Sequence, residues 1–361
     1  MLSLLKLESN LKALSPEPWT LFFRKRLNIL WGSNGSGKSA IQESLTLALS
    51  GAVYESFFRN SVASGNLLKE MIPKGASELF IELKTTDGLC SYKLKATGGR
   101  PQRLVASPPP GKGPGWEVVN PSELRDIIKG TAATQVEFFS QIQGDNKQPY
   151  SDFFHRLCPE HRPAVAASLG AEGDADVLEI IGLLKVWKQD VDAKVKLIEF
   201  CDANLSSRPA EIAHMNLGQL KAESKQFASS IAAMYKYLTE FLVVTLDSAA
   251  ELASKFTGMD IKAHLDVDTF YFTMNGHRAL SSGQEALLLA GLTAALFDHP
   301  RSIIMLSDRG MSETFVRQFM VGMVNFNGFV FLSYATDKEP NFAETSLAWD
   351  VIDANAVRRR K

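Results

Sequence analysis

The chain has 361 residues, 45% of them hydrophobic, and a formal net charge of −1. This length predicts two or three domains, and the near-zero charge excludes a polycation, so any nucleic-acid contact must come from a local basic patch. Three separate cysteines, Cys90, Cys158 and Cys201, argue against a disulfide framework or zinc site. The N-terminal apolar run is too short for a signal peptide, and the longest run, residues 286–297, is too short to span a membrane. We therefore expect a cytoplasmic protein without membrane contact.

Strands are predicted at residues 2–8, 19–23 and 27–31. The third leads into Gly-Ser-Asn-Gly-Ser-Gly-Lys-Ser at residues 32–39. Behind it, Ile41, Leu45 and Leu49 repeat every four residues, which predicts a helix over residues 40–50. Strand, glycine loop and helix together are the context of a phosphate-binding P-loop.

The chemistry of this loop follows from its residue types. Its glycines let backbone N–H groups surround a phosphate chain at a helix N-terminus, where the helix dipole favours negative charge. Lysine reaches the β- and γ-phosphates, and the following serine offers a hydroxyl to Mg²⁺. The predicted nucleotide-binding residues here are Asn34, Gly35, Ser36, Gly37, Lys38 and Ser39.

Two basic stretches flank the next predicted elements. Residues 24–26, Arg-Lys-Arg, either face nucleotide or DNA or form a solvated strand end. Alternating apolar residues on both sides of an Asp-Gly turn predict a β-hairpin over residues 79–94. The Gly- and Pro-rich loop 97–116 carries Arg100, Arg103 and Lys112, and is either a solvated loop or a contact for DNA phosphates.

The middle of the chain is predicted to be mainly helical. A short helix over residues 121–128, with Asn120 as its N-cap, precedes a strand over residues 135–142 that ends at Gln143. Apolar residues spaced by three, four and seven then predict two long helices, within residues 177–198 and 220–241. They form either an antiparallel hairpin with a coiled-coil-like seam or a pair packed on the globular part.

The last third returns to strands. Strand character at residues 261–274 is followed by Leu-Ser-Ser-Gly-Gln at 280–284 and an apolar helix over 286–297. Residues 302–308 form a buried strand that ends in Asp308, and residues 328–333 form another.

Together these motifs resemble the ABC-type ATPases. The segment 280–284 is similar to their signature motif with Ser282 in place of one glycine, and Gln143 resembles their Q-loop glutamine. Asn34 in the P-loop, the segment 74–77 before the hairpin and the helical insertion resemble the SMC/SbcC/RecF branch of DNA-maintenance ATPases. The resemblance covers most of residues 1–151 and 261–335.

This resemblance implies an α/β fold: a P-loop ABC-ATPase head with a mixed sheet, flanking helices and an antiparallel β subdomain, plus a short helical hairpin. The implied domains are an N-terminal lobe (1–165), the helical insertion (166–255) and a C-terminal lobe (256–361). In the family, two heads bind two ATP molecules between them, with the P-loop of one and the signature serine of the other at the same γ-phosphate. ATP, Mg²⁺ and an ATP-dependent homodimer are therefore expected.

The implied site residues extend beyond the P-loop. Ser281, Gly283 and Gln284 would bind nucleotide, and Ser39, Gln143 and Asp308 would lie at the metal. The residues implied to act in catalysis are Asp308, Gln143, Ser281 and Glu313.

Departures from the family pattern bear on hydrolysis. Arg309 follows Asp308 where the family has the glutamate that polarises water, and Tyr334 replaces the switch histidine. An alternative register puts Ser307 at the aspartate position and Asp308 at the glutamate position. Gly310 follows Asp308 by two residues, as the first glycine follows the aspartate in the Asp-Glu-Gly-Phe-Gly stretch of SbcC. This spacing favours Asp308 as the metal residue. Glu313 is a candidate relocated carboxylate.

Three functions remain open. The first is a slow, ATP-dimerised DNA repair or processing ATPase that works with an SbcD-like nuclease subunit. The second is a nucleotide-gated clamp or scaffold with negligible hydrolysis, and the third is an anti-phage defence ATPase with a separate effector. No cysteine pair lies at the tip of the predicted hairpin, which excludes a zinc hook.

Overall fold

The fold is taken from a computed structural model, which divides into two compact units. Unit 1 holds Met1–Asp126, Ser248–Lys262 and Phe272–Lys361, and unit 2 holds Ile127–Asp247 and Ala263–Tyr271. The predicted three-part division stays a prediction. The residues that the structure describes are 3–11, 18–51, 72–97, 100–105, 115–143, 147–149, 152–153, 155–169, 174–205, 207–267, 269–307, 311–342 and 347–359.

Unit 1 contains a five-stranded parallel sheet in the order β14-β3-β13-β12-β7. Three of its strands are mostly apolar and almost fully buried, as expected for strands covered on both faces. The predicted strands at 27–31 and 328–333 are thus confirmed, as is the strand at 302–308 up to Ser307, its last described residue, whereas the edge strands were not predicted. The strands are β3 (Leu27–Gly32), β7 (Glu117–Val119), β12 (Ser302–Ser307), β13 (Phe329–Ala335) and β14 (Trp349–Asp353).

A second, antiparallel sheet has the order β2-β1-β4-β5-β6. The predicted hairpin is confirmed as β4 and β5, in a register that runs from Glu78 opposite Lys95 to Thr85 opposite Gly88. Leu79, Ile81 and Leu83 on β4 are fully buried while alternate residues are not, so one face lies on the core. The strands are β1 (Leu4–Ser9), β2 (Trp19–Phe22), β4 (Glu78–Thr85), β5 (Gly88–Lys95) and β6 (Gln102–Leu104).

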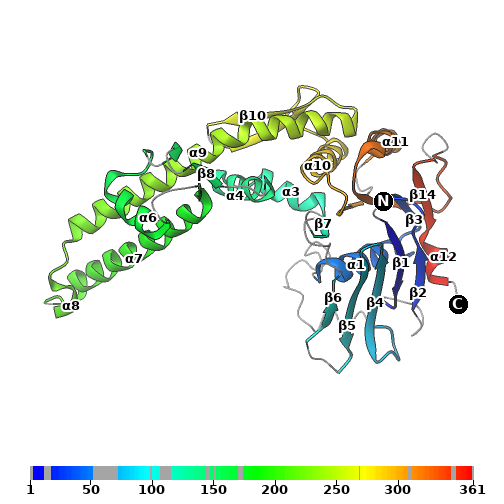
Figure 1. Ribbon diagram of the computed structural model, residues 1–361, viewed down its shortest axis with the longest axis horizontal. Helices are drawn as coiled ribbons and strands as arrows, with labels where there is room; N and C mark the ends of the chain where they lie inside the picture. Colours follow the sequence, from blue (N-terminus) through cyan, green and yellow to red (C-terminus); the bar gives the residue numbers. More distant parts are fainter. Residues whose placement is uncertain are drawn as a thin grey trace. The chain divides into compact units, whose positions relative to one another are not determined.

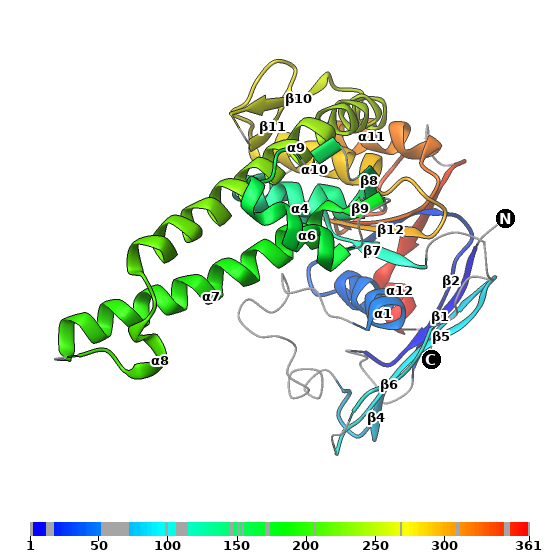
Figure 2. The same ribbon diagram turned by 60° about the vertical axis from the view of Figure 1, so that its left-hand side comes forward.

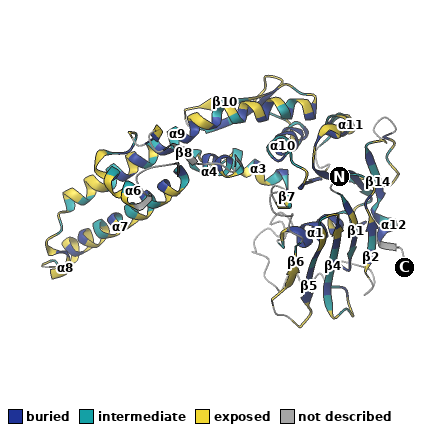
Figure 3. Ribbon diagram, in the orientation of Figure 1, coloured by how far each residue is buried: buried dark blue, intermediate teal, exposed yellow. Residues whose placement is uncertain are grey.

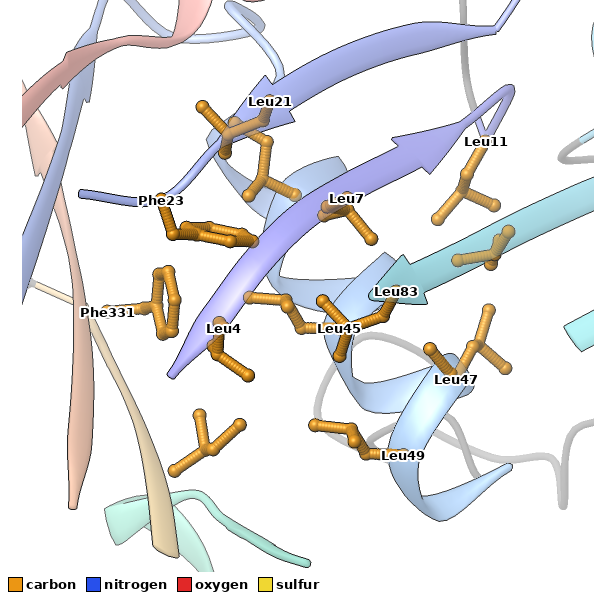
Figure 4. Close-up of a cluster of buried hydrophobic side chains, with 14 of the residues drawn as sticks. Leu4, Leu7, Leu11, Leu21, Phe23, Leu45, Leu47, Leu49, Leu83 and Phe331 are labelled. Carbon is orange, nitrogen blue, oxygen red and sulfur yellow. The ribbon is translucent and has the colours of Figure 1, made fainter. Parts of the chain in front are cut away.

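Helix α1 (Lys38–Ser50) lies between the two sheets. Its Ile41 and Leu45 share a core cluster with the buried faces of both, including Leu7 of β1 and Phe331 of β13 (Figure 4). Figure 1 and Figure 2 show α1 beside β4 and β5. The parallel sheet is also covered on its other face, where the Trp349 indole donates to the Met320 carbonyl of α11 (Glu313–Gly322) at 2.9 Å.

A nearly buried ion pair joins the two sheets. Nε of Arg301, just before β12, lies 2.9 Å from Oδ2 of Asp87 in the β4–β5 turn, with side chains 10% and 12% exposed. We expect Asp87→Ala to lower the free energy of unfolding by about 2 kcal/mol, because it leaves a buried guanidinium charge without its carboxylate. Urea unfolding measures this. The control is Glu82→Ala, which breaks the more exposed Lys93–Glu82 pair and should cost less than about 1 kcal/mol; equal losses would contradict the expectation.

The predicted strand over residues 135–142 is wrong: this segment is helix α4 (Ala132–Gln143). Its buried residues Val136, Phe139 and Ser140 recur at helical spacing. The Gln135 amide also donates to Phe270 O and accepts from Phe270 N, which satisfies the backbone of a neighbouring strand. A helix-start signal was present, since the Thr131 hydroxyl accepts from Thr134 N–H. The preceding helix, α3 (Pro121–Ile128), is confirmed with Asn120 as its cap.

Unit 2 contains an antiparallel helical hairpin of α7 (Val177–Asn204) and α9 (Leu217–Thr257), and the last part of α9, from Ser248, belongs to unit 1. Ser224 donates to Asp192 at 2.5 Å and Lys221 pairs with Glu199 at 2.8 Å, so residue numbers rise on one helix as they fall on the other. Buried and exposed residues alternate around both helices (Figure 3). The two predicted helices are confirmed. At the end of the second predicted range Leu242 is buried, whereas Phe241 is 39% exposed.

The tip of this hairpin is closed by its own contacts. Arg208 donates to both carboxylate oxygens of Asp202 at 2.6 Å, and Ile198, Cys201 and Ile212 form a small core. Near the other end, Glu137 of α4 accepts from Lys185 and Tyr235. Burial raises the Glu137 pKa, but these hydrogen bonds outweigh it and hold that pKa below its usual value. Their stabilisation is therefore present at neutral pH and lost as pH falls through the lowered pKa.

The remaining helices and strands are short, apart from α10. No helix among the described residues is long and apolar enough to cross a membrane. The elements are β8 (Lys147–Pro149), β9 (Asp174–Asp176), α6 (Arg162–Leu169), α8 (Ala210–Ala213), β10 (Ile261–Asp266), β11 (Thr269–Met274), α10 (Ser282–Leu296), α12 (Ala354–Arg359), and the 3₁₀ turns Pro159–His161 and Met323–Asn325.

Candidate functional site

The predicted P-loop connects β3 to α1, as its pattern requires. Gly32, Gly35 and Gly37 all have positive φ (146°, 82° and 105°), a region that side chains disfavour. At Gly32 a Cβ would also lie 2.7 Å from Ser36 Oγ and 3.0 Å from Asn355 Nδ2. The glycines are therefore required by the shape of the loop.

Lys38 lies on the inner side of this loop. Its Nζ donates to the carbonyl oxygens of Gly32 at 2.6 Å and Ser33 at 2.9 Å. The α1 N-cap, Gly37, supplies no side-chain hydrogen bond to the first turn. First-turn N–H groups of a 13-residue helix beside an ammonium group make a site suited to a phosphate chain.

Gln42 fixes α1 to two strands of the parallel sheet. This residue is 6% exposed, and its amide donates to Leu306 O of β12 at 3.0 Å and Phe331 O of β13 at 2.9 Å. It lies one turn after Lys38 and Ser39. The structure thus brings the P-loop helix onto the strands that carry Ser307 and Tyr334. Sequence reasoning missed Gln42, although a polar residue beside Ile41 in an apolar helix was a usable signal.

Asp308 and Arg309 lie outside the described residues, so the register of the sequence motif is open at that point. The last described residue of β12 is Ser307, which pairs with Ser333 of β13. Tyr334, predicted at the switch-histidine position, lies opposite Trp31 of β3, and its ring packs edge-on against Phe342 at 5.6 Å between centroids. This position therefore supplies an aromatic contact and no imidazole.

Glu313, the candidate relocated carboxylate, is the first residue of α11. Its Oε1 accepts from Arg317 Nη2 at 2.7 Å and Nε at 3.1 Å. Arg317 also donates to Asn341 O at 2.8 Å and lies over the Phe342 ring, 5.3 Å from its centroid. Arg317 therefore links Glu313 to the segment after β13. The i,i+4 spacing of Glu313 and Arg317 permits their ion pair, but it does not indicate the contact with that segment.

The predicted signature turn caps helix α10. The Ser281 hydroxyl accepts from Gln284 N–H at 3.4 Å, and the Gln284 side chain accepts from Ser281 N–H at 3.0 Å. This reciprocal capping holds the turn at the N-terminus of a 15-residue helix, with Gly283 buried beneath it. Such an end attracts anions.

Other predicted contact residues have structural partners. Lys25 donates to Trp349 O, and Arg26 donates to the carbonyls of Phe326 and Asn327. Arg103 donates to Leu49 O at 2.5 Å, at the C-terminus of α1. These basic residues therefore donate to backbone carbonyls within the fold, and they are weak candidates for binding DNA.

Two further predicted positions are only partly defined. Gln143 ends helix α4 instead of following a strand, and its side chain is outside the described part of the chain. Arg100 is exposed, whereas Lys112 and residues 360–361 are not among the described residues.

Comparisons with known proteins agree with this geometry. Residues 9–150 match a family model described as an AAA domain. No curated protein matches the sequence.

Solved structures match over most of the chain. An Smc head domain with an extended coiled coil, bound to the C-terminal domain of ScpA, from Pyrococcus furiosus has a TM-score of 0.50 at 15% identity, covering 93% of this chain and 90% of that one. An Smc head with a coiled coil and joint from Pyrococcus yayanosii has 0.49 at 13%, covering 92% of each chain. The recombination mediator RecF with ATP has 0.47 at 11%, covering 94% of each. The chain therefore has the fold of the Smc head domain, and its residues 9–150 match an AAA domain.

Proposed function

We propose that this chain is an ATP-binding head that dimerises around ATP, hydrolyses it slowly and acts on DNA. The observation that carries the proposal is the P-loop itself, with Lys38 on the loop carbonyls and α1 held by Gln42 on β12 and β13. This arrangement offers an ammonium group and helix N–H groups to a phosphate chain, beside the strand ends that carry the candidate reactive residues.

The signature turn supports dimerisation. Because the Ser281 oxygen accepts from Gln284 N–H, the hydroxyl hydrogen remains available to donate to an anion. A γ-phosphate held by the P-loop of a second copy fits this donor and the adjacent helix N-terminus. ATP would then be a ligand of both heads, and its hydrolysis would remove contacts that favour the dimer.

The proposed cofactors are ATP and Mg²⁺. Ser39 is the second residue of α1, and its hydroxyl is a suitable oxygen ligand for Mg²⁺. Gln143 is the other residue proposed at the metal, joined by Asp308 if the strand register follows the glycine of Asp308-Arg309-Gly310. When bound, the metal would offset phosphate charge, while Lys38 and the loop N–H groups hold the phosphates in place.

A nucleotide-gated clamp with negligible hydrolysis is the second candidate. Two contacts favour it: Glu313 is held by Arg317, and Tyr334 packs against Phe342 instead of providing an imidazole. DNA and an SbcD-like nuclease subunit remain proposed partners for either function. Steady-state turnover with and without DNA separates the two, since only the first predicts stimulated hydrolysis.

Dimerisation is tested at Ser281. We expect Ser281→Arg to leave ATP binding to the monomer intact but to abolish the ATP-dependent dimer, because a long cation cannot fit at the opposed nucleotide. Light scattering with ATP measures the dimer, and the control Gln102→Arg adds the same charge on the antiparallel sheet. A dimer that persists in Ser281→Arg would rule out the sandwich.

A further inference from the structure

Two serines end neighbouring strands beside the P-loop helix. Ser307 is the last residue of β12 and pairs with Ser333 of β13. Ser333 is 8% exposed, and its Oγ has no hydrogen-bond partner among the described residues. A buried hydroxyl of this kind usually has a partner, so its position calls for a ligand or water.

Strand periodicity shows which face carries these serines. Residues two apart on a strand share a face, so Ser307 lies on the face of Met305, and Ser333 on that of Phe331. Both of those residues belong to the core cluster that contains Leu45 of α1, and Figure 4 shows Phe331 and Leu45 at the same core. Ser307 and Ser333 therefore lie on the face that α1 covers.

The register also places them next to the phosphate loop. Ser333 pairs with Leu30 of β3, and the next pair on that face is Ala335 with Gly32, the first loop glycine. The carbonyl of Gly32 accepts from Lys38, and Gln42 holds α1 on the carbonyls of Leu306 and Phe331, which precede the two serines closely in sequence. The two serines thus lie on the α1 side of the sheet, toward the end of the strands from which the P-loop starts, with Ser333 buried and Ser307 exposed at the end of β12.

We infer that the Ser307 hydroxyl, with Ser333 beside it, occupies the position at the end of β12 that would face a nucleotide-bound Mg²⁺, called here the metal-facing position. This rests on the proposed ATP site. Mg²⁺ in proteins is usually bound through one or two carboxylates together with substrate phosphates. Here the α1-facing strand position offers neutral hydroxyls, which carry no charge to attract the cation. Nucleotide affinity should therefore depend only weakly on Mg²⁺, and Asp308, which follows in sequence, is left for another role.

The experiment compares ATP affinity in excess Mg²⁺ and in EDTA, using a fluorescent ATP analogue. For the wild type we expect less than about a threefold difference. Ser307→Asp adds a carboxylate at the metal-facing position, so Mg²⁺ should tighten binding about tenfold or more, and binding in EDTA should weaken because the carboxylate repels phosphate. Ser307→Asn adds similar bulk without charge, so the ratio of its affinities in Mg²⁺ and in EDTA should stay below about threefold whatever its absolute affinity. Thermal melting checks that both variants fold.

Two results separate the possible failures. Wild-type affinity that rises tenfold or more with Mg²⁺ and loses this dependence in Asp308→Asn would overturn the inference, because Asp308 would then be the metal residue. In that case the proposed ATP function stands. Absence of ATP binding in both conditions would refute the proposed function and the inference with it.

Discussion

Lys38→Ala should weaken ATP binding by more than about 100-fold, equivalent to about 2.7 kcal/mol. Lys38 is the only fully charged side chain between residues 32 and 39. Its Nζ already lies within hydrogen-bond distance of two carbonyls in the loop, so it can be directed to phosphate by a small displacement. Charge-assisted hydrogen bonds to phosphate are about twice as strong as neutral ones, and no neighbouring loop residue can replace them.

Isothermal titration with ATP measures the loss. Lys84→Ala is the matched control, because it removes the same charge from an exposed position on β4. It should bind ATP as the wild type does. Undiminished affinity in Lys38→Ala, or an equal loss in Lys84→Ala, would mean that the loop does not hold the phosphates.

Much of the fold could be predicted because its signals are local. The hairpin of β4 and β5 follows from alternation around an Asp-Gly turn, and the three central parallel strands are mostly apolar. α4 was misassigned as a strand because a short run of aromatic and β-branched residues is compatible with both the helical and the strand period. The contacts that decide it, from Gln135 to Phe270, join residues 135 positions apart and leave no local pattern.

The candidate site was predictable only as far as its motifs extend. Spacing located the P-loop and the signature turn, and a helix cap at Ser281 could be read from the following glutamine. Gln42, Ser333 and Arg317 were missed because their roles depend on partners far away in sequence. Charge alone left open whether the basic residues contact DNA or are solvated, whereas Lys25, Arg26 and Arg103 donate to backbone carbonyls that only the folded chain brings near.

Hydrolysis should be slow, with ATP-bound dimers that persist long after mixing. A general base near the attacking water contributes typically about 10²- to 10⁴-fold, and a permanently protonated arginine cannot act as one. Glu313 is a poor substitute because Arg317 holds its carboxylate by two hydrogen bonds. If Ser307 occupies the metal-facing position, Asp308 falls at the place of the water-polarising carboxylate, but its side chain is one methylene shorter than the family's glutamate.

Single-turnover hydrolysis at saturating ATP tests this assignment with three variants. Asp308→Glu should speed hydrolysis by about 100-fold, at the lower end of a general base's contribution, because it restores the longer carboxylate. Arg309→Glu is the matched control at the neighbouring position and should leave the rate unchanged within about twofold, as should Glu313→Gln. Acceleration in Arg309→Glu alone would place Asp308 at the metal and contradict the strand register. Fast wild-type turnover that is lost in Glu313→Gln would instead identify Glu313 as the base, and would require Arg317 to release it when ATP binds.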